Sequence, residues 1–137
     1  KVLSEVLVGK KNHIKIFGDD YNTPDGTAIR DYMHVCDLAD IHVEVAKYLL
    51  ENLSSNLFNC GYGKGFSVLD VINTANKIYK NKIPYKFTSR RDGDVEKLVA
   101  DTSKILKHID WKPKYNDLKE IINSSVNWEK KINASNT

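Results

Sequence analysis

The chain has little cysteine, little net charge and no long apolar run, and each shortage excludes a class of protein. Its two cysteines, Cys36 and Cys60, show neither CxxC spacing nor a histidine partner pattern, so we expect reduced, partly buried thiols and no disulfide or zinc framework. His34 and His42 are expected to be a strand residue and a helix-surface residue rather than metal ligands, and no metal site is predicted.

The charge balance and the lack of a long apolar run exclude two classes of partner. Lys and Arg number 21 against 18 Asp and Glu, which gives only +3 with the signs interspersed, so no nucleic-acid partner is expected. No apolar run approaches the roughly 20 residues that cross a bilayer, so no membrane partner is expected either. These features are typical of a cytoplasmic protein whose ligand must be found in a local site.

The first residues read as a helix that has already begun. Val2, Leu3, Val6 and Leu7 stand at helical spacing before any capping residue has appeared. We therefore expect that an N-terminal part is missing from this chain, which otherwise has the length of one domain.

Helical and strand patterns then alternate, which predicts an α/β chain of short strands and helices. Polar turn formers at 18–27 separate two of the strands, and Ser67 with Asp70 resembles a capping box. The predicted elements are a helix ending at Gly9, strands at 13–18 and 28–35, a helix from an N-cap at Asp37 to Asn52, a strand at 56–60, a helix to about Lys80, a strand at 83–89, a short helix at 101–109, and a helix capped by Asp117 and Glu120 through Trp128.

A glycine-rich stretch, "CGYGKGFS" at 60–67, lies between a predicted strand and a predicted helix, where phosphate-binding loops occur. Its spacing fits neither GxGxxG nor GxxxxGK[ST]. We interpret it as a plain strand-to-helix turn in which Gly61, Gly63 and Gly65 permit unusual backbone angles, and Lys64 as a solvated side chain.

Two turns carry arginines. Arg30 stands beside Asp31 after the polar turn, and "SRRDGD" places Arg91 close to Asp94 directly after a strand. Guanidinium groups could bind a phosphate and a carboxylate could bind a sugar diol. From its own neighbourhood, however, Arg30 is better explained by pairing with Asp31, and the second turn by a solvated charge cluster.

Taken together, "IFGDDYNTPDGTAIRDYMHVCDLADIHV", "NLFNCGYGKGFSVLDV" and "RRDGD" resemble the C-terminal part of the UDP-glucose 4-epimerases (UDP-galactose 4-epimerases). These belong to the extended short-chain dehydrogenase/reductase family, with an N-terminal Rossmann domain for NAD and a smaller C-terminal domain for the UDP-sugar. The resemblance implies that 1–137 is the UDP-sugar-binding portion and that 36–82 packs against the missing NAD domain. The complete protein would then be a cytoplasmic homodimer that interconverts UDP-glucose and UDP-galactose by oxidation and reduction at hexose C4.

The resemblance also assigns roles to residues. Lys15, Ile16 and Phe17 match the stretch that packs against uracil, with Phe17 as the aromatic partner. Arg30 and Arg91 match the two arginines that contact the pyrophosphate.

Three further positions follow from the same resemblance. Asp94 matches the acid that binds the ribose hydroxyls, and Asp31 would orient the strand that carries Arg30. Leu98 falls where some bacterial members have a tyrosine against the hexose, so we expect room for a bulkier 2-substituent such as N-acetyl.

The family's catalytic motif is YxxxK, and none of Tyr32, Tyr48 and Tyr79 has a lysine four residues on. No GxxGxxG segment opens the chain, so neither catalytic nor NAD-binding residues are expected here, and the fragment alone should be inactive. The alternatives are another nucleotide-sugar epimerase, dehydratase or decarboxylase of the family, and a stand-alone UDP-sugar-binding module.

Overall fold

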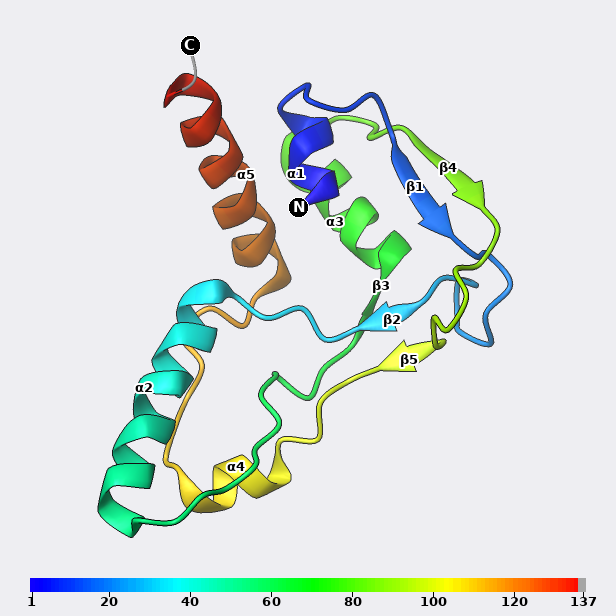
Figure 1. Ribbon diagram of the computed structural model, residues 1–137. Helices are drawn as coiled ribbons and strands as arrows, with labels where there is room; N and C mark the ends of the chain where they lie inside the picture. Colours follow the sequence, from blue (N-terminus) through cyan, green and yellow to red (C-terminus); the bar gives the residue numbers. More distant parts are fainter. Residues whose placement is uncertain (136–137) are drawn as a thin grey trace.

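The computed structural model describes residues 1–135 and has two halves joined through short central strands (Figure 1). Helices α1, α3 and α5 gather with β1 and β4 in one half, while α2 and α4 form the other. The elements are α1 (Val2–Leu7), β1 (Ile14–Phe17), β2 (Ile29–Arg30), α2 (Val35–Asn52), β3 (Phe66–Ser67), α3 (Val68–Tyr79), β4 (Tyr85–Thr88), β5 (Lys97–Leu98), α4 (Ser103–His108) and α5 (Leu118–Ser135).

Two small sheets position the charged turns. β1 pairs in parallel with β4, with Phe17 opposite Thr88. The second sheet has the order β3-β2-β5, in which β2 is antiparallel to β3 and parallel to β5, with Arg30 opposite Leu98. The turn at 89–96 connects β4 to β5 and therefore links the two sheets.

The larger core lies between β1, α3 and α5. It consists of aliphatic side chains brought together by alternation along β1 and helical spacing along α3 and α5. Its buried members are Ile14, Ile16, Ile72, Ala75, Ile83, Leu118, Ile122 and Val126.

The smaller core joins α2 to α4 and the segment that follows α4. Its buried members are Ile41, Ile105, Ile109 and Trp111. Much of the apolar surface beyond it stays open to solvent, since Leu50 is 77%, Leu53 88% and Leu57 81% exposed.

Several predictions made from local patterns are confirmed. Ser67 and Asp70 form a reciprocal capping box at the start of α3. The strand at 13–18, the strand at 83–89 and the short helix at 101–109 are present with slightly tighter bounds. Both cysteines are free thiols, although Cys36 is exposed rather than partly buried.

The predicted start of α2 was wrong. The N-cap is His34, whose Nδ1 accepts a hydrogen bond from the main-chain N–H of Cys36 at 3.1 Å, so His34 is a cap and not a strand residue. Asp37 lies inside the first turn and is fully buried. The preference of aspartate for N-cap positions was overridden by tertiary partners of its carboxylate.

Strand lengths were also overestimated. Of 28–35 only Ile29–Arg30 form a strand, and 56–60 forms none because no described strand lies alongside to accept its hydrogen bonds. β3 and β5, two residues each, were not predicted. The last helix continues past Trp128 to Ser135, so most of the polar tail is helical, and 136–137 lie outside the described residues.

Candidate functional site

Arg30 pairs with Asp94 rather than with its neighbour Asp31. Its Nη2 donates to Asp94 Oδ1 at 2.7 Å, and its Nη1 donates to the carbonyl of Ile29 at 2.8 Å. The two side chains of the ion pair are 24% and 31% exposed, so the pair is partly open to water. The two predicted charged turns therefore meet in space.

Asp31 has a different partner, the glycine-rich loop. Its carboxylate accepts hydrogen bonds from the main-chain N–H groups of Tyr62 at 3.1 Å and Gly63 at 3.0 Å. A longer bond of 3.4 Å comes from the N–H of Ala100. Successive N–H groups of this kind form an anion-binding nest, and here the chain's own carboxylate fills it.

The glycines of this loop serve two purposes. Only Gly63 among them has a positive φ, of +67°, so the prediction that all three permit unusual angles was wrong for the other two. A Cβ on Gly61 would lie 2.5 Å from Asp31 Oδ2, and one on Gly65 would lie 2.4 Å from Ile29 Cγ2. Gly61 and Gly65 therefore allow the loop to approach β2 closely.

Phe17 and Arg91 form the second part of the site. The guanidinium carbon of Arg91 lies 3.6 Å from the centre of the Phe17 ring, a cation–π contact. Both line a groove of about 440 Å³ together with Lys15 and His13. Ile16 is 1% exposed and belongs to the core, so its side chain faces away from this groove.

Arg90 points elsewhere and anchors the polar turn. Its Nε donates to Asp20 Oδ1 at 2.7 Å, and its Nη2 donates to the carbonyl of Asp20 at 2.7 Å. The guanidinium also lies 4.2 Å from the centre of the Tyr21 ring. Adjacent arginines therefore divide two tasks, since Arg90 fixes the loop before β2 and Arg91 faces the groove.

Leu98 lies beside the ion pair. It is opposite Arg30 in the β2-β5 register, and its side chain is 62% exposed. Leu98 therefore presents an exposed apolar side chain on the strand next to Arg30.

A buried polar network around Asp37 was missed by sequence reasoning. Asp37 is fully buried and accepts hydrogen bonds from Tyr62 Oη at 2.6 Å and from the N–H groups of Lys114 at 3.0 Å and Tyr115 at 2.9 Å. Burial opposes ionisation of Asp37, but these donors outweigh it and lower the pKa of the carboxyl. Burial and the bond to Asp37 raise the pKa of Tyr62 to about 12.

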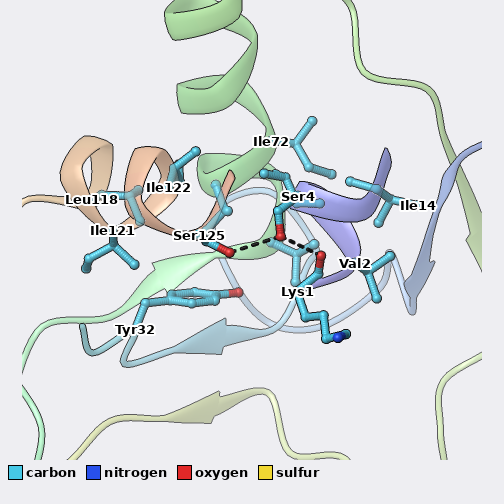
Figure 2. Close-up of a pocket in the computed structure, with 13 residues that line it drawn as sticks. Lys1, Val2, Ser4, Ile14, Tyr32, Ile72, Leu118, Ile121, Ile122 and Ser125 are labelled. Carbon is cyan, nitrogen blue, oxygen red and sulfur yellow. Dashed lines mark hydrogen bonds between the residues drawn. The ribbon is translucent and has the colours of Figure 1, made fainter. Parts of the chain in front are cut away.

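An apolar cavity of about 230 Å³ lies between α1, α3 and α5 (Figure 2). Tyr32 borders it, and burial raises the pKa of this phenol. Ser4 and Ser125 share a hydrogen bond of 2.9 Å across its edge. None of the seven predicted site residues lines this cavity, although Val2 borders both the cavity and the groove at Phe17.

Tyr115, unlike Tyr32, Tyr48 and Tyr79, has a lysine four residues on, Lys119. Such spacing aligns two side chains only within a helix, and Tyr115 precedes α5, which begins at Leu118. Its ring stacks on His34 with centroids 4.6 Å apart. The match therefore lacks the helical geometry that would place tyrosine and lysine on one face.

The described residues do not fit NAD. The one glycine-rich loop that precedes a helix has its Tyr62 and Gly63 N–H groups occupied by Asp31, which leaves them unable to hold a pyrophosphate. Within 1–135, no cluster of three metal-ligating side chains is found, and no helix is long and apolar enough to span a membrane.

Comparison with known proteins gives consistent matches over nearly the whole chain. A family model described as GDP-mannose 4,6 dehydratase matches residues 1–124. The chain is 43% identical over 135 residues to a UDP-glucose 4-epimerase of Azospirillum brasilense. This alignment covers 98% of this chain and 39% of that protein. It thus spans about 39% of the length of that relative, at its C-terminal end.

Solved structures show the same fold. A UDP-glucose-4-epimerase from Stenotrophomonas maltophila, with bound NAD and formylated UDP-arabinopyranose, superposes with a TM-score of 0.91 at 34% identity, covering 97% of this chain and 39% of that one. The UDP-Glc/GlcNAc 4-epimerase of Campylobacter jejuni gives a TM-score of 0.84 at 45% identity, covering 95% and 39%. The fold is therefore the C-terminal portion of an extended short-chain dehydrogenase/reductase.

Proposed function

Since the chain belongs to the GDP-mannose 4,6 dehydratase family, we propose that it is the UDP-sugar-binding part of a UDP-glucose 4-epimerase. The complete enzyme would interconvert UDP-glucose and UDP-galactose at hexose C4. NAD, held by a part of the enzyme outside this chain, would take up hydride and return it to the other face of the sugar. This fragment would bind and orient the substrate and would be inactive alone.

The observation that carries the proposal is the convergence of β2 with the distant turn at 89–96. Arg30 and Asp94 are in contact at 2.7 Å, and Arg91 lies three residues before Asp94 in a turn closed by a main-chain hydrogen bond of 3.2 Å. Phe17 lies beneath Arg91. Two guanidinium groups, a carboxylate and an aromatic ring are thus available along one surface.

Each group suits one part of a UDP-sugar. Guanidinium forks neutralise and orient a diphosphate, and the carboxylate of Asp94 can accept hydrogen bonds from the ribose hydroxyls. The Phe17 ring would cover the uracil, with Lys15 at the rim of the groove. Ile16 would contribute its main chain only.

We infer that the open apolar surface of α2 and of the segment 53–58 packs against the missing NAD domain. The exposures of Leu50, Leu53 and Leu57 support this, because such a group of side chains is rarely left in water. The resemblance implies that all of 36–82 packs against the NAD domain. The contact proposed here is smaller and leaves out α3, because α3 buries its apolar face within this chain.

Substrate choice would depend on Leu98. A leucine is smaller than the tyrosine of other bacterial members and leaves space beside the sugar, so we propose that N-acetylated UDP-hexoses are accepted. The 45% identity to a UDP-Glc/GlcNAc 4-epimerase supports this. A homodimeric, cytoplasmic complete enzyme without a nucleic-acid partner is part of the same proposal. The resemblance supports the homodimer, and the net charge of only +3 argues against a nucleic-acid partner.

The test uses the full-length protein that contains this chain. It should form UDP-galactose from UDP-glucose, and Arg91→Ala should raise the KM by about tenfold or more, because a charged hydrogen bond to the diphosphate is lost. Lys77→Ala, which removes an exposed cation on α3, should leave the KM within twofold. A folded full-length protein that binds UDP and forms no UDP-galactose would contradict the epimerase assignment.

A further inference from the structure

Tyr62 binds two acids, Asp31 through its main chain and Asp37 through its side chain, and these acids stand at the two ends of the segment that follows β2. Its main-chain N–H donates to Asp31, the residue after Arg30, at 3.1 Å. Its Oη donates to Asp37 Oδ2 at 2.6 Å and accepts from the N–H of His34 at 3.1 Å. One residue of the glycine-rich loop therefore fixes both ends of 31–37.

The contacts of Tyr62 with Asp31 and Asp37, here called the brace, are made rigid by their surroundings. Asp37 is fully buried and is also held by the main chain ahead of α5. Gly61 packs so tightly on Asp31 that a methyl group would not fit between them. With a pKa of about 12, Tyr62 keeps its proton and remains a donor to Asp37 at any pH at which the protein would be assayed.

The brace lies next to Arg30, which together with Arg91 forms the proposed diphosphate clamp. Asp31 also donates its own N–H to the carbonyl of Leu98 at 3.2 Å and receives the N–H of Ala100 at 3.4 Å, so it ties β2 to β5. Asp31, the residue that Tyr62 holds, therefore fixes the main chain directly after Arg30. Small displacements of a charged group have large effects on ligand binding.

We propose that Tyr62 is a positioning residue that fixes Arg30 for a nucleotide diphosphate. Its hydroxyl acts through His34 and Asp37, while its main-chain N–H, which a phenylalanine would keep, holds Asp31. This rests on the proposed function, since it assumes that Arg30 contacts phosphate. The side chain of Tyr62 does not touch the ligand in this proposal, and its influence passes through the backbone of 31–37.

The test compares UDP with uridine, which lacks the phosphates, by calorimetry on the full-length protein. Tyr62→Phe removes one hydroxyl and should weaken UDP binding about tenfold, within the range of coupling between contacting residues, while uridine binding changes less than twofold. Tyr79→Phe removes a hydroxyl that donates to Asn123 at 2.9 Å, and should leave both affinities unchanged.

The decisive arm is the Arg30→Ala background, in which Tyr62→Phe should have no further effect on UDP binding. Equal losses for UDP and uridine, or a loss that persists without Arg30, would overturn the positioning role. Asp31→Asn provides a second variant that should reproduce the UDP-selective pattern. If Arg30→Ala weakens UDP but both brace variants bind normally, only this inference fails; if Arg30→Ala binds UDP normally, the proposed clamp fails with it.

Discussion

Replacing Arg30 with alanine tests the proposed diphosphate clamp most directly. In the free protein Arg30 Nη2 is engaged by Asp94 at 2.7 Å, and the remaining guanidinium N–H groups beyond the one bound to Ile29 can face a ligand. The substitution therefore removes the phosphate donors and also leaves the carboxylate of Asp94 without its cation.

The magnitude follows from the exposure of the pair. Hydrogen bonds to charged groups contribute about 1.5 to 3 kcal/mol, which corresponds to roughly 10- to 150-fold in affinity. Arg30 is 24% and Asp94 31% exposed, so water screens the interaction and places the direct loss in the lower half of that range. The unpaired carboxylate of Asp94 would repel the diphosphate and add to the loss, so we expect UDP to bind roughly 10- to 50-fold more weakly.

Calorimetric titration of UDP into the full-length protein measures this effect, at low salt and again at about 0.5 M salt, where the difference should shrink because exposed charges are screened. The matched control is Lys107→Ala, which removes one exposed cation from α4 and should change the affinity less than twofold. UDP affinity that is unchanged in a folded Arg30→Ala variant would refute the phosphate role. An equal loss in Lys107→Ala would show that net charge, and not the clamp, is responsible.

Two further predictions concern the sugar and the buried acid. Leu98→Tyr should lower kcat/KM for UDP-N-acetylgalactosamine at least tenfold relative to UDP-galactose, as a ring fills the space beside the 2-substituent; a wild-type enzyme that strongly prefers the plain sugar, with no response to the substitution, would end the idea. Because the pKa of Asp37 is lowered in the folded state, its contribution to stability is full above the ordinary carboxyl pKa and is lost as the pH falls through the lowered value. Asp37→Asn should therefore reduce the free energy of unfolding at pH 7 by about 1.5 to 3 kcal/mol and flatten its decline in acid, which urea titrations from pH 7 to pH 3 can measure.

The parts of the fold that were predicted correctly depend on local chemistry. The capping box of Ser67 and Asp70 and the apolar spacing along α3 carry their information within a few residues. β3 and β5 are two residues long and exist only because β2 lies between them, which no local pattern could indicate. The strand predicted at 56–60 fits its local pattern but has no neighbouring strand in the described chain.

The candidate site divides in the same way. Residue types and the resemblance made Arg30, Arg91 and Asp94 candidates, but did not indicate that Arg30 and Asp94 would contact each other. The partner of Asp31 could not be predicted. Its carboxylate binds main-chain N–H groups, which every residue except proline has, so no residue type in the sequence indicates the contact. Asp37 was misread as a helix cap since its true partners lie in the segment ahead of α5.

Because Arg91 stacks on Phe17, a nucleotide that binds in this groove has to replace that contact with one of its own. The ring is covered by a guanidinium 3.6 Å away, so a base that stacks on that face must first displace the cation. A nucleoside without phosphate displaces Arg91 and offers it no new partner, whereas a nucleoside diphosphate supplies an anion at the moment the ring is vacated. Discrimination between the two would thus begin in the free protein, in the contact that the ligand has to replace.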